Sequence, residues 1–315
     1  MVNKMENEKV YWEEYVKING IDQYFLHYPS LHKTVLLHLH GGPGGSEALT
    51  SYYLHPHVKD FCTLVYYDQR GAGKTQIRIK SKPDDLSLEV LLADLQQSIA
   101  YIKKKHETDQ IILLGHSWGS VLGTQYILRH PEDITAYIGY GQVVDMKQGE
   151  KLGYEKLREK MTQSGATKDL KKLNNLGDYP NGVKDFNKAV LKFRKLQRKH
   201  GFMEENKLVT QIMSNSPLHF GLWDIFTLLR IVKLNRKLRD TLLQYSVWDT
   251  TDYPVPVYYI LGKNDWITPS TLAEAHFRRI NAPQKGLYWI ENTEHHPELA
   301  NPAVFGKAIR EILQG

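Results

Sequence analysis

The chain has 315 residues, of which 41% are hydrophobic and 24% charged, a composition typical of a globular protein with a sizeable core. Its single cysteine, Cys62, excludes internal disulfides and thiolate zinc clusters. The N-terminal stretch lacks the apolar segment of a signal peptide, and the most apolar later stretch, 218–234, is interrupted by Asp224 and Arg230. We therefore expect a cytoplasmic protein without a membrane span.

The net charge of +6 is distributed unevenly along the chain. Residues 143–245 hold 21 Lys and Arg against 11 Asp and Glu, so this part carries +10 and the rest carries −4. Such asymmetry marks residues 143–245 as a distinct unit. Their basic side chains are spread over helical segments without interleaved aromatics, which favours a solvated surface and predicts no nucleic-acid partner.

Strand and helix patterns alternate through the first part of the chain. A β-hairpin is predicted over residues 9–28, because Asn19-Gly20 separates two strand-like segments. A helix is predicted over 87–105, where Leu and Ile recur on one face and Ser87 is the N-cap. Short apolar runs predict buried strands at residues 34–40, 63–67, 111–114 and 136–141. This alternation indicates an α/β fold with a mostly parallel sheet and helices on both faces.

The pattern changes after residue 142. Residues 143–245 read as several helices without a convincing strand, including one block around 186–196 and another from 218 through 243. Beyond them the predicted elements are a strand at 255–261, a helix at 273–280, a strand at 286–291 and a helix at 302–313. We therefore predict an α/β core formed by 1–142 and 246–315, with residues 143–245 inserted as a helical cap, or lid, domain.

Residues 115–119 read Gly-His-Ser-Trp-Gly and fit the pattern G-x-S-x-G. An apolar strand precedes them and a helix pattern follows, which is the context of a nucleophile elbow. In such a turn the central residue, Ser117, is strained, and its neighbours must be small. The amide of Trp118, at the start of the following helix, is then a candidate oxyanion donor.

A second glycine-rich turn follows the strand at 34–40. Residues 40–45 read His-Gly-Gly-Pro-Gly-Gly, which allows close approach of the backbone to a substrate. Gly42 precedes the proline, as the oxyanion residue does in hydrolases with a His-Gly-x-Pro turn. Gly42 is therefore our candidate for the second oxyanion donor.

A serine nucleophile needs a base and an acid that orients it, and both are expected where parallel strands end. Asp265 follows the strand at 255–261, and adjacent histidines, His295 and His296, follow the strand at 286–291. The chain order serine, acid, histidine is that of the elbow-type fold. Asp145, which follows the strand at 136–141, is an alternative acid. The residue types alone leave the choice of histidine open.

Two other motifs carry weaker signals. His38 and His40 share one strand face, but no third ligand lies nearby in sequence, so packing is favoured over metal binding. Gly73-Lys74-Thr75 resembles the end of a phosphate-binding loop, but Asp68 occupies the position of its first glycine and would repel phosphates. We expect no metal and no organic cofactor.

The motifs together resemble the prolyl aminopeptidase (proline iminopeptidase) family of α/β-hydrolases. The resemblance covers roughly residues 20–142 and 250–315. The residues that carry it are His40-Gly41-Gly42-Pro43-Gly44, Asp68-Gln69-Arg70-Gly71-Ala72-Gly73, Gly115-His116-Ser117-Trp118-Gly119-Ser120 and Gly262-Lys263-Asn264-Asp265. In hydrolases of this fold the base is followed, after six residues, by a proline, and counting back from Pro302 gives His295.

The resemblance implies an acyl-enzyme mechanism. Ser117 would be the nucleophile, His295 the base and Asp265 the acid that orients it, with the amides of Gly42 and Trp118 as the oxyanion hole. The expected substrate is a small peptide from which an N-terminal residue, proline-type, is released. Alternatives are an esterase or amidase on small acyl substrates, and a slow-turnover homologue that only binds its ligand.

Substrate recognition rests on a further implication of the resemblance. Family members that remove N-terminal proline hold the substrate amine with acidic cap residues, and the only adjacent acidic pair here is Glu204-Glu205. The sequence departs from the family pattern at Ala72, His116 and Glu294, which leaves strict proline specificity open. The basic cap could instead steer a substrate that bears a carboxylate.

Overall fold

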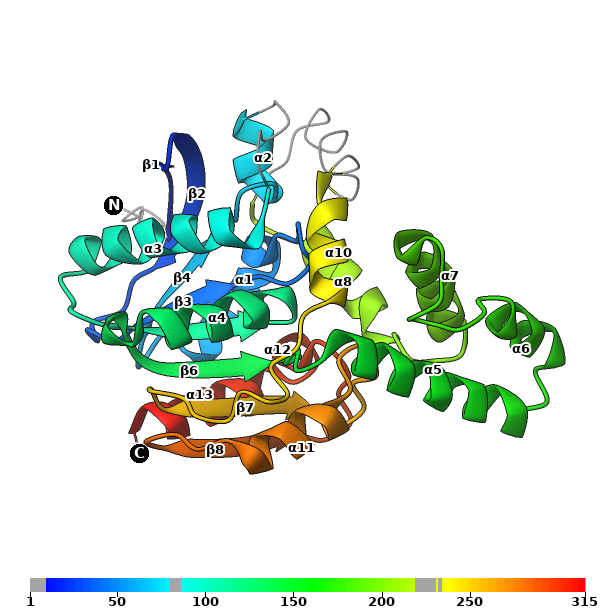
Figure 1. Ribbon diagram of the computed structural model, residues 1–315. Helices are drawn as coiled ribbons and strands as arrows, with labels where there is room; N and C mark the ends of the chain where they lie inside the picture. The colour runs from blue at the N-terminus through cyan, green and yellow to red at the C-terminus, as the bar shows by residue number, and fades with distance from the viewer. Residues whose placement is uncertain (1–9, 80–85, 219–230, 232–233, 315) are drawn as a thin grey trace, which may run out of the picture.

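The computed structural model describes residues 10–79, 86–218, 231 and 234–314. In these residues eight strands form one mixed sheet, ordered β1-β2-β4-β3-β5-β6-β7-β8 (Figure 1). β1 pairs antiparallel with β2 and β2 antiparallel with β4, and all other neighbours are parallel. The strands are β1 Trp12–Ile18, β2 Ile21–Tyr28, β3 Val35–Leu39, β4 Thr63–Tyr67, β5 Ile111–His116, β6 Ile134–Tyr140, β7 Val257–Gly262 and β8 Lys285–Ile290.

The central strands β3, β4, β5 and β7 are buried along their whole length, as their continuous apolar runs predicted. Side chains from alternate strand positions belong to two hydrophobic clusters, one on each face of the sheet. Helices α3 (Leu88–Lys105), α4 (Trp118–Arg129) and α11 (Ser270–Arg279) cover one face, and α1 (Ser51–Leu54) and α13 (Pro302–Gln314) cover the other (Figure 1). The mostly parallel α/β architecture predicted from the sequence is confirmed.

The core helices predicted from the sequence are present as α3, α4, α11 and α13. α3 begins directly after Ser87, whose hydroxyl accepts a hydrogen bond from the Val90 amide at 3.4 Å. α11 begins at Ser270, three residues before the predicted start, because Pro269 precedes it and fixes the entry into the helix. The core helices are η1 Glu47–Thr50, α1 Ser51–Leu54, η2 His55–His57, α2 Gly73–Ile79, α3 Leu88–Lys105, α4 Trp118–Arg129, η3 Pro131–Asp133, α11 Ser270–Arg279, α12 Pro297–Ala300 and α13 Pro302–Gln314.

A run of helices is inserted between β6 and β7. Its described helices are α5 Met146–Gln163, α6 Thr167–Asn174, α7 Phe186–Lys199, α8 Glu205–Ser214 and α10 Arg236–Leu243. α5, α6 and α7 lie beyond the arrowheads of β6 and β7 (Figure 1) and share a third hydrophobic cluster centred on Leu157, Met161 and Phe193. The block predicted from 218 through 243 lies partly outside the described residues. The cap boundaries at 143 and 245 stay a prediction. No described helix combines the length and the apolar character needed to cross a bilayer.

Candidate active site

Ser117 lies at the sharp turn between β5, which ends at His116, and α4, which begins at Trp118. Its backbone has φ 48° and ψ −114°, a conformation that a non-glycine residue adopts only under strain. The flanking glycines are required by packing: a Cβ on Gly119 would lie 1.9 Å from the Leu39 carbonyl oxygen, and one on Gly115 would lie 2.9 Å from the Gly119 carbonyl oxygen. The predicted nucleophile elbow geometry is therefore present at this turn.

Asp265 and His295 come from the loops that follow β7 and β8. His295 Nδ1 lies 2.8 Å from Asp265 Oδ2, and the Asp265 carboxylate also accepts hydrogen bonds from the amides of Ile267 (2.8 Å) and Thr268 (3.0 Å). The Thr268 hydroxyl donates to Oδ2 at 2.8 Å. Burial alone would raise the pKa of Asp265, but His295 and these donors hold it below its usual value. Asp265 is therefore an anion at neutral pH.

His295 is buried, and burial lowers its pKa below the ordinary value despite the attraction of Asp265. The imidazole is therefore neutral near pH 7. Because Asp265 is ionised, it accepts a hydrogen bond from the Nδ1–H group of His295, and this tautomer leaves Nε2 as a proton acceptor. Gly141 makes room for the ring, since a Cβ on Gly141 would lie 2.9 Å from His295 Cε1.

The sequence left His296 and Asp145 as alternatives, and each has a different partner. His296 Nδ1 lies 3.1 Å from Glu298 Oε1. Asp145 is the N-cap of α5, where its carboxylate accepts a hydrogen bond from the Gln148 amide at 2.8 Å. Of the two candidate acids, it is therefore Asp265 whose carboxylate contacts one of these histidines, His295.

The glycine-rich turn after β3 packs against Ser117. A Cβ on Gly41 would lie 3.3 Å from Ser117 Cβ, so this turn borders the elbow directly. Gly42 has φ 128°, and a Cβ there would lie 2.6 Å from the Gly44 nitrogen, so only glycine fits. Trp118 is the first residue of α4, and amides in a helix's first turn have no carbonyl partner within the helix. Both predicted oxyanion donors thus belong to turns that flank Ser117.

Buried polar contacts hold these two turns together. The Trp118 indole donates to Gln69 Oε1 at 2.9 Å, and Gln69 Nε2 donates to the His40 carbonyl oxygen at 3.2 Å. His40 Nε2 accepts a hydrogen bond from the Gln69 amide at 3.0 Å. His38, which shares the strand face considered for a metal, instead contacts the Tyr140 hydroxyl at 2.7 Å. These partners support the packing interpretation of both histidines.

Glu204 and Glu205, the predicted amine-binding pair, differ in their surroundings. The Glu205 carboxylate accepts hydrogen bonds from the amides of Glu294 (2.6 Å) and His296 (2.7 Å), on either side of His295. In return, Glu294 accepts a hydrogen bond from the Glu205 amide at 3.2 Å. Glu205 therefore fastens α8 to the His295 loop, and burial raises its pKa. Glu204, Glu205 and Glu294 all line a cavity of about 480 Å³ beside this loop.

Two residues near the site carry no sequence prediction. Thr268, which holds Asp265, could have been recognised from the Asp-x-x-Thr spacing before a helix, because such side chains commonly bond nearby backbone. Glu47 accepts hydrogen bonds from the Gly41 amide at 3.0 Å and lies 2.5 Å from His116 Nδ1. Nothing local in the sequence points to this contact, because the two side chains are 69 residues apart.

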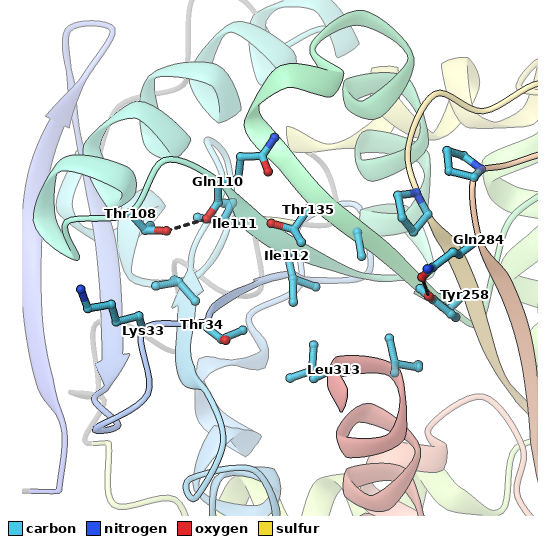
Figure 2. Close-up of a pocket in the computed structure, with 15 residues that line it drawn as sticks. Lys33, Thr34, Thr108, Gln110, Ile111, Ile112, Thr135, Tyr258, Gln284 and Leu313 are labelled. Atoms are coloured by element: carbon cyan, nitrogen blue, oxygen red, sulfur yellow. Dashed lines mark hydrogen bonds between the residues drawn. The ribbon is translucent and has the colours of Figure 1, made fainter. Parts of the chain in front are cut away.

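Another cavity, of about 550 Å³, lies at the opposite edge of the sheet, where β3, β5, β6 and β7 begin and the end of α13 approaches (Figure 2). Among its described lining residues Lys33 is the only charged one, and Thr108 and Tyr258 are hydrogen-bonded to their neighbours there. Ligands of open α/β sheets bind at the carboxyl ends of the strands. The turn that contains Ser117 is therefore the better candidate site.

The comparisons with known proteins agree with this geometry. The model of the alpha/beta hydrolase fold family matches residues 34–301. The probable aminopeptidase YbaC of Bacillus subtilis (strain 168) is 23% identical over 303 residues, covering 94% of this chain and 92% of that protein. The proline iminopeptidase of Saccharolobus solfataricus is 26% identical over 322 residues, covering 96% of this chain and 92% of that protein.

A crystal structure of the proline iminopeptidase of Mycobacterium smegmatis has a TM-score of 0.65 at 17% identity and covers 96% of this chain and 98% of that one. At this identity the similarity supports the fold alone. The resemblance drawn from the motifs is confirmed, since relatives over nearly the full length are proline iminopeptidases and a probable aminopeptidase. The chain belongs to the α/β-hydrolase fold family.

Proposed function

We propose that this chain is a serine hydrolase that works through an acyl-enzyme and releases N-terminal residues, of the proline type, from peptides. The observation that carries the proposal is the strained strand-to-helix turn, φ 48° and ψ −114°, which presents Ser117 at the carboxyl end of β5. The Asp265–His295 pair, joined at 2.8 Å at the ends of the neighbouring strands β7 and β8, supports it.

In the proposed reaction the Ser117 hydroxyl attacks the carbonyl carbon of the scissile bond while His295 Nε2 takes its proton. His295 then gives this proton to the leaving nitrogen as the C–N bond breaks and the acyl ester of Ser117 forms. Asp265 keeps the imidazole in the required tautomer and stabilises its cation. A water molecule, deprotonated by His295, finally attacks the ester, and Ser117 recovers its proton.

The developing oxyanion needs donors at the position that its charge will occupy. We assign this role to the amides of Gly42 and Trp118, because both belong to turns that border Ser117. Loss of one such donor typically costs about 2.7–4 kcal/mol of transition-state stabilisation. The Gln69 contacts to Trp118 and His40 would keep the two turns in register.

The aminopeptidase assignment rests on the relatives and on the acids near the His295 loop. Several relatives are proline iminopeptidases, and one is a probable aminopeptidase. In this chain Glu204, Glu205 and Glu294 line the cavity of about 480 Å³ beside that loop, together with Lys156 and Lys160, and Glu204 and Glu294 are the candidates for a substrate amine. Glu205 is a weaker candidate than the sequence suggested, because its carboxylate is held by two backbone amides.

That engagement of Glu205 favours one alternative function. An esterase or amidase on small acyl substrates would need no carboxylate for a free amine. The inserted residues 143–245, with a net charge of +10, would favour acyl substrates that bear a carboxylate. The two functions share Ser117, His295 and Asp265, and they differ in whether the substrate amine is required.

The test is steady-state hydrolysis of a matched substrate pair, prolyl-anilide with a free amine and the same compound N-acetylated. Wild type and Ser117→Ala are measured with both compounds. We expect wild type to cleave the free-amine compound, the acetylated compound to be cut at least about 100-fold more slowly, and Ser117→Ala to lose activity by more than about 10⁴-fold.

Each other outcome is informative. Equal cleavage of both compounds, or of the acetylated one alone, would favour the esterase or amidase. Full activity in Ser117→Ala would contradict the serine mechanism. If neither compound is hydrolysed, a serine-directed phosphonate is used next. Labelling of Ser117 would indicate a hydrolase with another substrate. Tight binding of a ligand without turnover would indicate a slow homologue.

A further inference from the structure

Behind Ser117 lies a second carboxylate–imidazole pair, Glu47 and His116. His116 is fully enclosed, and its Nδ1 lies 2.5 Å from Glu47 Oε1. Its Nε2 lies 3.0 Å from the carbonyl oxygen of His295. Because a carboxylate and a carbonyl oxygen can only accept, both ring nitrogens donate, and the ring is an imidazolium.

The electrostatic surroundings agree with this protonation state. Burial alone would lower the pKa of His116, but the carboxylates of Glu47 and Glu298 and the His295 carbonyl raise it to about 9. Burial would raise the pKa of Glu47, yet His116 and His38 bring it well below its usual range. The pair is therefore ionic at neutral pH. The His116 ring also stacks on Tyr140 with centroids 4.4 Å apart.

This pair touches three separate segments of the candidate site. Glu47 accepts a hydrogen bond from the Gly41 amide at 3.0 Å, which holds the turn that contains Gly42. His116 precedes Ser117 in the chain and so holds the elbow. Its bond to the His295 carbonyl fixes the base loop. A Cβ on Gly41 would lie 2.9 Å from His116 Nδ1 and 3.3 Å from Ser117 Cβ, so the oxyanion turn and the elbow pack without space between them.

We propose that the Glu47–His116 ion pair is a positioning device that sets the oxyanion turn, the Ser117 elbow and the His295 loop relative to one another. The proposal rests on the proposed serine mechanism. In that mechanism neither Glu47 nor His116 touches the substrate or transfers a proton. Their effect is on alignment, and a displacement of about 1 Å in a catalytic constellation can cost about 100-fold in rate.

The test uses Glu47→Gln, His116→Phe and the double variant. Glu47→Gln keeps the shape of the side chain, and His116→Phe keeps a ring on Tyr140 but removes both donors. We expect each single variant to lower kcat by about 10- to 100-fold with KM changed by less than about threefold. Since the two residues act as one unit, the kcat of the double variant should be at most about threefold below that of the less active single variant.

Asp133→Asn is the matched control. Its side chain is 18% exposed, against 15% for Glu47, and it also bridges a cation and a second polar group, Lys103 and the Tyr126 hydroxyl. It lies in η3, before β6, away from the three segments. We expect it to leave kcat within about twofold. The double variant also covers the case in which His116→Phe misfolds because Glu47 is left charged without its partner.

A pH profile separates positioning at the base loop from a loss of stability. The titratable and charged groups that face His295 are Asp265 from the β7 loop, His116 from the elbow and His296 beside it, with Arg194 of α7 beyond Asp265. The His116 ring lies 4.8 Å from that of His295 and disfavours its protonation. In His116→Phe the acidic limb of the kcat/KM profile should therefore move to higher pH, whereas Asp133→Asn should leave it in place.

Phosphonate labelling of Ser117 keeps the two proposals distinguishable, because it needs no knowledge of the substrate. Fast labelling of wild type and slow labelling of the Glu47 and His116 variants supports the positioning role. Equally fast labelling of all of them, or multiplied losses in the double variant, overturns it and leaves the serine mechanism intact. No labelling of wild type would overturn both.

Discussion

Two carboxylate–imidazole pairs lie side by side in this protein, with the two rings 4.8 Å apart, yet they differ in protonation. In the Asp265–His295 pair the pKa of the histidine is lowered, and in the Glu47–His116 pair it is raised to about 9. Both histidines are buried, so burial alone cannot explain the difference. The acceptors around each ring can explain it.

His295 has one carboxylate partner, and that carboxylate is shared with other donors. Asp265 also accepts hydrogen bonds from Ile267 and Thr268, which stabilise its negative charge. His116 has an acceptor at each nitrogen, and Glu298 adds a second negative charge nearby. A ring with one acceptor therefore stays neutral and can serve as a base, whereas a ring held between two acceptors becomes a fixed cation.

The largest expected effect separates the two pairs by their role in the reaction. Asp265→Asn should lower kcat by about 10⁴-fold, because an amide no longer holds the proton on His295 Nδ1 and the wrong tautomer results. This loss exceeds the 10- to 100-fold loss expected for Glu47→Gln. The measurement is kcat for both variants on the substrate that wild type cleaves best.

The control for this prediction is Asp145→Asn, at the alternative acid considered from the sequence. Asp145 caps α5, so its replacement should leave kcat within about threefold and change stability by at most about 1 kcal/mol. Equal losses in Asp145→Asn and Asp265→Asn would mean that the assignment of the acid is wrong. Equal losses in Glu47→Gln and Asp265→Asn would remove the distinction between the two pairs.

The contrast between the pairs also marks what the sequence can predict. Asp265 and His295 lie just after strands, and the strand patterns that precede them are local, so their meeting at one sheet edge followed from topology. The sharp strand-to-helix turn at Ser117 was predicted in the same way, from local patterns. Glu47 and His116 are 69 residues apart, and no periodicity or spacing links a residue of η1 to the last residue of β5.

The inserted helices illustrate a second limit. The acidic pair Glu204-Glu205 was conspicuous in the sequence, but its chemistry depends on which groups α8 meets. The structure pairs Glu205 with backbone amides 89 and 91 residues away, and backbone amides have no sequence signature. A role as amine ligand was therefore the natural prediction for Glu205, and the contacts point to a role in holding the His295 loop. Strand and helix patterns predict elements, but they do not predict such contacts.

An intermediate effect is expected at this contact. Glu205→Ala would leave the Glu294 and His296 amides without acceptors, which should lower stability by about 1–3 kcal/mol. Because the amides flank His295, kcat should also fall by about 10-fold, equally for free-amine and acetylated substrates. Glu204→Ala, the matched control, should instead raise KM for free-amine substrates alone. A selective effect of Glu205→Ala on free-amine substrates would restore it as the amine ligand.

The smallest expected effect concerns stability and pH. His116 has an ordinary pKa of about 6.5 when unfolded, and about 9 in the fold, so its contribution is complete below pH 6.5 and is lost as the pH rises to about 9. The pKa of Glu47 is lowered on folding, so its contribution is lost only as the solution becomes acidic. The ion pair should therefore make wild type less stable at pH 9 than at pH 6, by roughly 1–3 kcal/mol.

The measurement is the free energy of unfolding, by urea titration at pH 6 and at pH 9, for wild type, the Glu47→Gln/His116→Phe double variant and Asp133→Asn. The double variant should lose most of the difference between the two pH values, because it contains neither titrating partner. Asp133→Asn should keep that difference, since it leaves both Glu47 and His116 in place. If the double variant kept the full difference, His116 would not be the cation that distinguishes its pair from Asp265–His295.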